Sequence, residues 1–558
     1  MVRNYKILFF IMLLAWLLLN LIQANYTEVI SDEAYYRLYG RYLDWGYFDH
    51  PPMVALMTKI SSLFFSGNLG IRFVTVLMQP LTLIFIWRTI DDNNPDGDKV
   101  CSFFIIAGSI CMFAAYGFYT APDVPLLFFT AFFLWSYQRY LKSQAWKNIL
   151  FLSVSMAGLM YSKYQAFLVI GLIVLSNVRL LKSYRFWLGG VFALILLSPH
   201  IWWQFANDFP SFKFHLIERS EGFRWHHILE YIPNQMAVYN PLVLGAVFYI
   251  MIRNRSEDLF TRALYFLIIG FTGFFWLTAV RGHVEPHWTI SCCAAMIILI
   301  YNNSTVNPKM FRFIRKALLP IILIILTVRI LLVMDLPLVR YLGFNGKEAK
   351  YEFIESVAQD LPVVFKGSYQ GPSLYSFFTG KEGVCINSLY SRKTEFDIWQ
   401  FEKQYNNKPV FICGKVDGIS RLYEKDGISF YGYHTDSLQT VNRIEVKIIP
   451  RVELVYAGDS LSLTMILTNP YPYDIDFNHS RFPVRVCMAI MKGEKINLVP
   501  VILKEPVRIM KKGEQISRTF KALVPELPAG SYSFGISLQT NLGPAINGSF
   551  HEIKIAKR

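Results

Sequence analysis

The chain carries little charge for its length. Of its 558 residues, 17% are charged, 53% are hydrophobic and 16% are aromatic, and the mean hydropathy is +0.33. A soluble protein of this length has more charged and fewer apolar residues. The composition therefore argues against an ordinary soluble protein and favours a membrane protein.

The chain also lacks several informative patterns. It has no CxxC pair among its seven cysteines, which argues against a zinc or thioredoxin-type site. Four cysteines fall in apolar segments, and the three later ones permit at most one disulfide: Cys385, Cys413 and Cys487. No internal repeat and no low-complexity tract is present.

The net charge of +15 does not indicate nucleic-acid binding. The basic residues lie in short loops between apolar segments, and no basic stripe interleaved with aromatics occurs in the rest of the chain. Short basic loops of this kind set the orientation of membrane spans.

Long apolar segments occur before about residue 335 and are absent afterwards. Roughly 20 helical residues cross a hydrocarbon core of ~30 Å. We therefore predict eleven spans, at 5–24, 71–90, 99–118, 122–142, 147–162, 163–180, 184–204, 236–253, 260–280, 286–302 and 314–334. The first resembles a signal peptide, but we predict an uncleaved span because many others follow it.

The loop charges predict a cytoplasmic N-terminus. With that orientation the inside loops hold most of the clustered Lys and Arg residues: Arg139, Lys142, Lys147, Arg179, Lys182, Arg185, Arg253, Arg255, Arg262, Lys309, Arg312, Arg315 and Lys316. The unusual polar residues and everything after residue 335 then lie outside.

Three domains are expected. Residues 1–335 form the multi-span domain, and its first outer loop holds an interfacial helix at 32–45, aromatic face toward lipid, and a second short helix at 52–65. Mixed helix and strand patterns predict a small α/β domain at 336–440. Alternating apolar residues between turn signals predict an immunoglobulin-like β-sandwich at 441–558.

Two acidic motifs lie in the first outer loop. Asp32-Glu33 is either a solvated pair or a source of the carboxylate that a general base requires. In YFDHPP, Asp49 and His50 either form a turn before a helix or point into a membrane-facing cavity, and Pro51-Pro52 restricts the local backbone.

Other ionisable residues lie at the outer ends of spans. Asp123 in TAPDVP is either a helix cap or a functional acid. Lys163 either snorkels to the interface or binds an anionic headgroup. Arg219 lies in an aromatic, amphipathic loop and is a weaker candidate.

The segment RGHVEPHW places four further candidates between two spans: Arg281, His283, Glu285 and His287. Two histidines and a glutamate are possible ligands for a divalent cation, although their spacing matches no specific metal signature. Packed together, all these span ends would form a polar cavity at the outer interface.

Several motifs in order resemble the bacterial members of the protein O-mannosyltransferase family. They are SDEAYYRLYGRYLDWGYFDHPPMVAL, YTAPDVPLLFF, GLMYSKYQAF, SPHIWWQFANDFPSFKF and VEPHW. This family belongs to the GT-C glycosyltransferases, which include the aminoarabinose transferase of lipid A. The resemblance covers about residues 1–335, with a looser echo at 365–380, and leaves the predicted sandwich outside.

The resemblance implies an inverting transfer from a polyprenyl-phosphate sugar in the bacterial inner membrane. It implies that Asp32 is the general base, with Glu33 its neighbour in the acidic motif. It places Asp49, His50 and Asp123 at the donor phosphate or cavity wall, with Lys163 and Arg219 as further phosphate ligands. The aminoarabinose transferases carry lysine at the position of His50, so the resemblance does not identify the donor headgroup.

The sequence also does not identify the acceptor among proteins, lipids and glycans. Alternatives are a lipid-linked sugar transporter, a polysaccharide ligase and a non-catalytic scaffold. A transporter should carry charged or broken segments at mid-membrane, often in two related halves. The polar residues here crowd at one face, which favours an enzyme.

Overall fold

The chain folds into two compact units, Met1–Gly346 and Lys347–Arg558. The structure is a computed structural model that describes residues 2–215, 223–254, 258–306, 308–334, 336–493 and 495–557. The three-domain division expected from the sequence stays a prediction.

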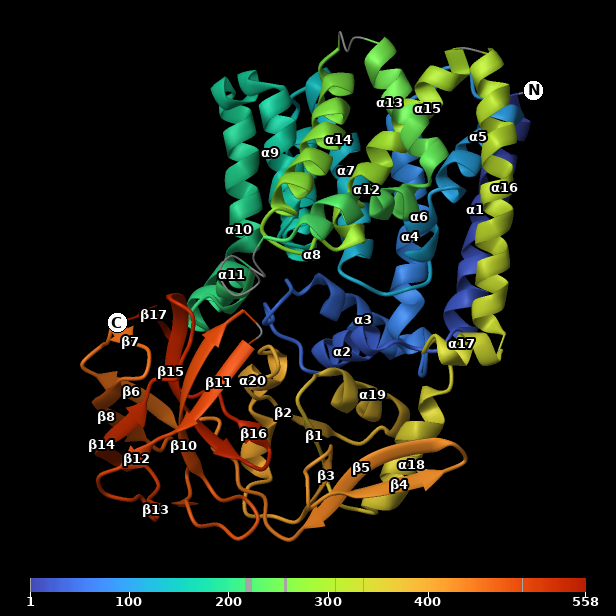
Figure 1. Ribbon diagram of the computed structural model, residues 1–558. Coiled ribbons are helices and arrows are strands. Elements are labelled where there is room, and N and C mark those ends of the chain that lie inside the picture. The colour runs from blue at the N-terminus through green and yellow to red at the C-terminus, as the bar shows by residue number, and fades with distance from the viewer. Residues whose placement is uncertain are drawn as a thin grey trace. The chain divides into compact units, whose positions relative to one another are not determined.

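The first unit is helical (Figure 1). Its elements are α1 (Val2–Tyr26), α2 (Ser31–Arg41), α3 (Met53–Phe64), α4 (Leu69–Ile90), α5 (Gly97–Gly108), α6 (Cys111–Ala115), α7 (Asp123–Lys142), α8 (Trp146–Ser162), α9 (Ala166–Ser176), η1 (Val178–Lys182), α10 (Tyr184–Ala206), α11 (Pro210–Lys213), α12 (Trp225–Tyr239), α13 (Pro241–Arg253), α14 (Leu259–Thr278), η3 (Pro286–Thr289), α15 (Cys292–Val306), α16 (Pro308–Val333) and α17 (Pro337–Tyr341).

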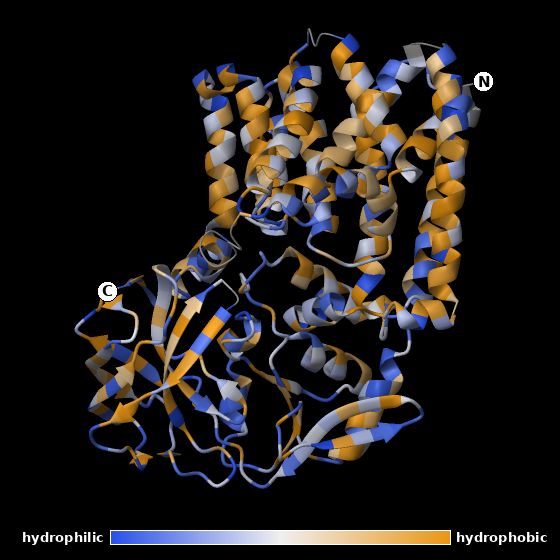
Figure 2. Ribbon diagram, viewed as in Figure 1, coloured by the Kyte–Doolittle hydropathy of each residue, from blue (hydrophilic) through white to orange (hydrophobic). Residues whose placement is uncertain are grey.

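Several of these helices are long and apolar enough to cross a membrane. Within the described residues, five helices have the length and composition of a membrane span: α1, α4, α10, α14 and α16. The number is six if the bent pair α12–α13 is one span. Figure 2 shows apolar residues along α1, α10 and α16. The total of eleven spans stays a prediction.

Two expected spans are broken. The segment predicted at 99–118 divides into α5 and α6 around Ser109, and α12 and α13 meet at 99° around Asn240. Asn240 has a φ of +68° and donates from Nδ2 to the Ser109 carbonyl oxygen at 2.6 Å, so the two breaks are joined. Irregular backbone needs such internal partners in an apolar medium.

The helix α9, within the predicted span 163–180, is shorter than that span. α9 has 11 residues, which rise only ~16 Å. That length is well below a hydrocarbon core of ~30 Å. The one-turn helix η1 follows it at Val178–Lys182.

The two short helices of the first outer loop form close to the predicted positions, as α2 and α3. The aromatic face of α2 was expected to face lipid, but Tyr35 and Tyr39 are buried within the protein. Tyr39 stacks on Tyr47 with ring centroids 3.9 Å apart. A Cβ at Gly40 would lie 2.4 Å from Thr58 Oγ1, so this glycine permits the close approach of α2 and α3.

The second unit begins with a five-stranded sheet. Its strand order is β2-β1-β3-β5-β4, with β1 parallel to β2 and β3 and the other pairs antiparallel. The elements are α18 (Lys347–Ala358), β1 (Val363–Lys366), α19 (Gln370–Thr379), β2 (Gly383–Ile386), α20 (Glu395–Trp399), η4 (Phe401–Gln404), β3 (Val410–Cys413), β4 (Arg421–Lys425) and β5 (Ile428–Thr435).

The rest of the second unit is strand-rich. The strands are β6 (Glu445–Ile449), β7 (Leu454–Tyr456), β8 (Ser460–Thr468), β9 (Ile475–Asp476), β10 (Arg485–Lys492), β11 (Lys495–Pro500), β12 (Ile502–Leu503), β13 (Ile509–Met510), β14 (Gln515–Leu523), β15 (Gly530–Thr540), β16 (Gly543–Pro544) and β17 (His551–Ala556). The path β11-β10-β15-β17-β7 and the sheet β12-β14-β8-β6 both contribute side chains to one core. The immunoglobulin-like assignment stays a prediction.

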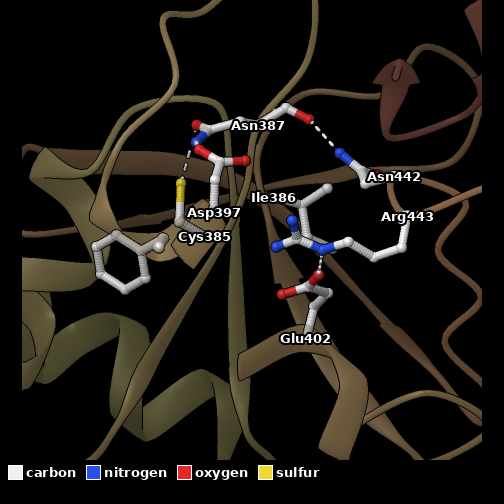
Figure 3. A pocket seen from close by; sticks show the side chains of 8 residues that line it. Cys385, Ile386, Asn387, Asp397, Glu402, Asn442 and Arg443 are labelled. Carbon is white, nitrogen blue, oxygen red and sulfur yellow. Dashed lines mark hydrogen bonds and ion pairs between the residues drawn. The ribbon is translucent and has the colours of Figure 1, made fainter. Parts of the chain in front are cut away.

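A small polar pocket lies where these two parts of the second unit meet (Figure 3). Its empty volume is about 200 Å³. Arg443 donates from Nε to Glu402 Oε1 at 2.9 Å, and Asn442 donates from Nδ2 to the Asn387 carbonyl oxygen at 2.7 Å. Burial raises the pKa of the Cys385 thiol beside them. These contacts join the segment after β5 to the residues around β2 and η4.

Candidate active site

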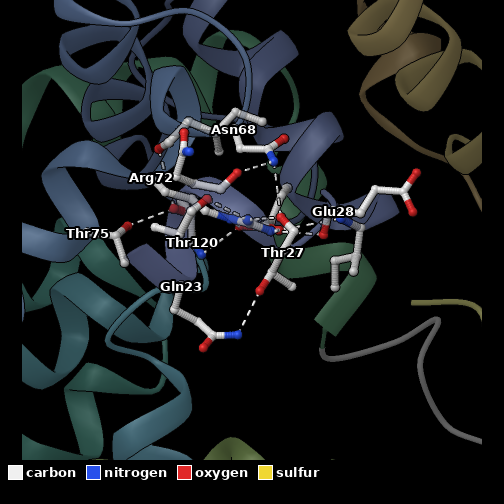
Figure 4. A network of polar contacts seen from close by, with 12 residues as sticks. Gln23, Thr27, Glu28, Asn68, Arg72, Thr75 and Thr120 are labelled. Atoms are coloured by element: carbon white, nitrogen blue, oxygen red, sulfur yellow. Dashed lines mark hydrogen bonds and ion pairs between the residues drawn. The ribbon is translucent and has the colours of Figure 1, made fainter. Parts of the chain in front are cut away.

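Glu33 forms a buried clamp near the start of α2. Figure 4 shows Arg72 and Thr120, which belong to the same network. The Glu33 carboxylate pairs with Arg72, whose Nε donates to Oε1 at 2.6 Å, and neither side chain is more than 1% exposed. The Thr120 amide also donates to Glu33 Oε1, at 2.9 Å. Arg72 uses its remaining donors on carbonyl oxygens at the end of α1, including that of Ala24 at 3.0 Å.

The clamp ties three segments together: the end of α1, the start of α4 and the loop before α7. A buried ion pair is tolerated when its remaining donors and acceptors are satisfied, as they are here. The Glu33 carboxylate is thus engaged with protein groups. We assign it to positioning, whereas the resemblance placed it in the acidic motif beside the base.

Asp32 lies in the first turn of α2 and is half-buried. Residues four apart share one face of a helix, so Asp32 shares its face with Tyr36. The Tyr36 hydroxyl lies 3.4 Å from His50 Nε2. Asp32 therefore lies on the face of α2 that contacts His50.

The loop between α2 and α3 carries Asp49 and His50. The Tyr39 hydroxyl donates to Asp49 Oδ1 at 2.6 Å. The other ring nitrogen of His50, Nδ1, is shielded from solvent and has no hydrogen-bond partner among the described residues. Burial lowers the pKa of His50 to about 4, with Asp49 opposing the shift and Lys163 adding to it. His50 is therefore a neutral imidazole at neutral pH.

Asp123 and Lys163 form a second buried ion pair. Lys163 Nζ lies 2.8 and 2.9 Å from the two carboxylate oxygens of Asp123. Lys163 is 6% exposed and Asp123 is 2% exposed. His287 Nε2 lies 3.9 Å from Asp123 Oδ2. Asp123 begins α7 and Lys163 ends α8, so the pair joins two helix ends.

These groups belong to one polar cluster. The charges that act on His50 include those of Asp49, Lys163, His215 and Asp123. His215 Nε2 also lies 3.0 Å from the Asp49 carbonyl oxygen. Four of the predicted donor-site residues thus come together, from one loop and two helix ends: Asp49, His50, Asp123 and Lys163.

The end of α10 supports the loop that carries Asp49 and His50. Trp203 Nε1 donates to Asp44 Oδ2 at 2.8 Å, and His200 Nδ1 lies 2.7 Å from the Trp45 carbonyl oxygen. The Ser211 hydroxyl donates to the Tyr47 carbonyl oxygen at 2.9 Å. The indole of Trp203 lies over Gly46, where a Cβ would be 2.3 Å from the ring.

Gly46→Ala should loosen this loop. The added methyl must displace an indole that is already hydrogen-bonded, and overpacking of this kind costs about 1–3 kcal/mol. We expect faster limited proteolysis within residues 42–52 and lower transfer activity. Gly245→Ala is the matched control, because nothing lies within 4 Å of a Cβ there. Equal behaviour of the two variants would contradict the assigned role of the indole contact.

Of the other predicted residues, His287 reaches this cluster through Asp123. Arg281 is exposed, and His283 Nε2 lies 3.8 Å from Glu285 Oε2. The described residues contain no group of three or more His, Cys, Asp or Glu side chains suited to hold a metal ion. Arg219 lies outside the described residues.

Sequence reasoning missed Arg72, Tyr36 and Tyr39. Arg72 had a usable signal, because it is an isolated charge at the start of an apolar segment. Tyr39 belongs to the aromatic face that was expected to lie toward lipid, and Tyr36 lies outside that face. Only the fold reveals that their hydroxyl groups reach Asp49 and His50.

Sequence comparison relates this cluster to known transferases. The family described as dolichyl-phosphate-mannose-protein mannosyltransferase matches residues 49–203, a range that contains Asp49, His50, Asp123 and Lys163. The lipid A galacturonosyltransferase RgtD of Rhizobium johnstonii is 23% identical over 307 residues. That match covers 52% of this chain and 64% of the relative.

Structure comparison agrees. The apo structure of ArnT from Cupriavidus metallidurans matches with a TM-score of 0.56 and 13% identity, over 77% of this chain and 98% of ArnT. The chain therefore shares its fold with ArnT. The same ArnT bound to undecaprenyl phosphate matches with a TM-score of 0.55, 14% identity and the same coverage. These matches agree with the resemblance drawn from the motifs, and the shared fold places Asp32 and the cluster in one helical unit.

Proposed function

We propose that this GT-C protein transfers a sugar from a polyprenyl-phosphate donor to a hydroxyl or lipid phosphate acceptor, at the outer face of the inner membrane. The observation that carries the proposal is the arrangement around α2. Asp32 shares a helix face with Tyr36, Tyr36 contacts His50, and His50 lies in the field of Lys163. A carboxylate, through Tyr36, and a cation are thus both connected to His50.

The proposed mechanism is an inverting displacement. Asp32 accepts the proton of the acceptor hydroxyl as that oxygen attacks the anomeric carbon. The bond between that carbon and the phosphate oxygen breaks, and charge builds on the departing lipid phosphate. Lys163, held in place by Asp123, stabilises this charge. The phosphate is a good leaving group, so the reaction requires no general acid.

His50 is a neutral hydrogen-bonding group in the proposed site. Its pKa of about 4 makes the imidazole neutral at neutral pH in the ligand-free protein. The buried Nδ1 is open for a hydrogen bond to the donor phosphate. An incoming phosphate charge offsets part of the burial effect and raises the pKa.

Donor binding should therefore depend on pH through His50. Because the bound state holds the proton more tightly, affinity should rise as pH falls toward about 4, by at most about tenfold per pH unit. A sugar phosphodiester of a polyprenol is the suitable probe, since its own charge is constant in this range. His50→Gln should remove the slope. An unchanged slope in this variant would assign the dependence to another group.

The relatives support the lipid chemistry. RgtD is described as a lipid A galacturonosyltransferase, and one ArnT structure holds undecaprenyl phosphate. We propose the same classes here, a polyprenyl-phosphate donor and a lipid acceptor, with protein and glycan acceptors as further possibilities for the test below.

We also propose the topology that this function requires: eleven spans, a cytoplasmic N-terminus, and a second unit outside the membrane composed of the α/β and sandwich domains. The clustered Lys and Arg loops support it. Single cysteines placed at residues 142 and 421 should react with an impermeant thiol reagent only at 421 in intact spheroplasts of a variant lacking the native cysteines.

Comparative glycan profiling tests the function. Cells that lack the gene are compared with the same cells carrying the wild-type gene, by mass spectrometry of envelope lipids, proteins and polysaccharides. One sugar modification present only with the gene would identify sugar and acceptor together. Identical profiles would contradict the proposal.

The bent pair α12–α13 favours the alternative of a lipid-linked sugar transporter, because broken helices often line transport sites. Purified protein in proteoliposomes separates the two functions. A transferase forms a new glycosidic bond and releases polyprenyl phosphate, whereas a transporter moves the intact donor between leaflets.

A further inference from the structure

Arg329 is a buried cation near the outer end of α16. Its Nη2 donates to Asn20 Oδ1 at 2.8 Å, and its Nε donates to Gln23 Oε1 at 3.4 Å. The guanidinium carbon lies 4.8 Å from the centroid of the Phe118 ring. The residue is 6% exposed, and these three partners are all uncharged.

The missing countercharge distinguishes Arg329 from the other buried cations of this unit. Arg72 pairs with Glu33, and Lys163 pairs with Asp123. Within the described part of the chain, no carboxylate lies within 4.0 Å of the Arg329 guanidinium. A guanidinium stays protonated in proteins, and a buried charge is costly without an anion. The site therefore favours an anionic ligand.

The surroundings limit which anion reaches it. α1 and α16 are the candidate spans with the least burial, at 28% and 11%, so most of their surface faces outward. Ile330 and Ile22, beside Arg329 and Gln23 in sequence, are both more than half exposed. Arg329 lies four residues before the end of α16, and Gln23 lies three before the end of α1. At the end of a span the abundant anion is a lipid phosphate.

We propose that Arg329, held by Asn20 and Gln23, binds the phosphate of a lipid that enters between α1 and α16. Arginine suits this ligand because its planar donors match phosphate oxygens. The site differs from the Lys163–Asp123 cluster, and the proposal does not depend on the transfer reaction.

The site is also linked to the clamp at Glu33. Gln23 Nε2 donates both to the Arg329 carbonyl oxygen at 3.2 Å and to Thr27 Oγ1 at 2.7 Å. The Thr27 carbonyl oxygen in turn accepts from Arg72 Nη1 at 2.5 Å. A phosphate on Arg329 therefore contacts the hydrogen-bond network that holds the start of α2.

Native mass spectrometry of the full chain in detergent tests the proposal. The probes are phosphatidylglycerol, undecaprenyl phosphate and a galactosyl diacylglycerol that has no phosphate. Wild type should retain a phosphate lipid and not the galactolipid. Arg329→Gln should bind it about tenfold or more weakly, the size expected for a charged hydrogen bond. Arg329→Lys, which keeps the charge, should retain part of the affinity.

The two phosphate probes separate the sources. An effect of Arg329→Gln on phosphatidylglycerol indicates a bilayer phospholipid, and an effect confined to undecaprenyl phosphate indicates the polyprenyl substrate. Arg312→Gln is the matched control, because Arg312 is an exposed arginine at the other end of α16. Equal losses in both variants, or equal retention of the galactolipid by wild type, would overturn the proposal.

If Arg329→Gln misfolds, a measurement on wild type alone still tests the proposal. Added phosphatidylglycerol or undecaprenyl phosphate should then raise the thermal midpoint of wild type, and the galactolipid should not. Equal stabilisation by all three lipids would again overturn the proposal.

Discussion

Asp32→Asn should reduce sugar transfer by about 10²- to 10⁴-fold, the usual contribution of a positioned general base. The amide keeps the shape of the side chain but cannot accept the proton of the acceptor hydroxyl. Asp32 is half-buried on the face of α2 that contacts His50, so the change removes the base without opening a cavity. The measurement is the rate of polyprenyl phosphate release by purified protein.

The control is Asp208→Asn, which changes an exposed carboxylate at a position with a φ of +61° that asparagine tolerates. It should keep the wild-type rate. The thermal midpoint of Asp32→Asn should also match that of wild type. Full activity in Asp32→Asn at an equal protein level would show that another group is the base, while leaving the family assignment intact.

Breaking the Glu33–Arg72 clamp should have the largest effect on stability. Glu33→Ala leaves a guanidinium that is 1% exposed without its anion, and loss of one partner of a buried pair costs about 3–5 kcal/mol. It also leaves the Thr120 amide without its acceptor. We expect a clearly lower thermal midpoint for the helical unit and little recoverable activity.

The double variant Glu33→Leu/Arg72→Met sharpens this test. It removes both charges and fills part of the space with apolar atoms, so its destabilisation should be smaller than the sum of Glu33→Ala and Arg72→Ala. Lys142→Met is the control for an exposed pair, because Lys142 and Asp91 are about 60% exposed, and it should change stability by less than about 1 kcal/mol. Additive losses in the double variant would show that the two charges do not interact.

Much of the local structure could be predicted from short-range patterns. The spacing of apolar residues predicted α4, α7, α8 and α10 within two residues at each end, because a continuous apolar stretch has few other solutions in a membrane. In the second unit, the region 441–558 that was predicted to be strand-rich contains β8 at Ser460–Thr468, where apolar residues alternate. Alternation of side chains along a strand is likewise a local property.

The breaks were harder to predict. Ser109 and Asn240 interrupt apolar stretches. Asn240-Pro241 is a local turn signal, but the contact between the two breaks is not local. The Ser109 carbonyl oxygen accepts a hydrogen bond from the Asn240 side chain, across 131 residues of chain. A pattern read along one segment contains no information about a partner at that distance.

The sequence by itself determined that the chain has a helical membrane-type unit, a strand-rich C-terminal part, and the acidic and basic motifs of GT-C proteins. These follow from composition, periodicity and motif order, all of which are local. The tertiary structure alone decided which motifs meet. It paired Asp123 with Lys163, assigned Glu33 to Arg72 rather than to a substrate, and left Arg329 among neutral partners. Such choices depend on which distant side chains burial brings within hydrogen-bonding distance, and burial is a property of the packed chain.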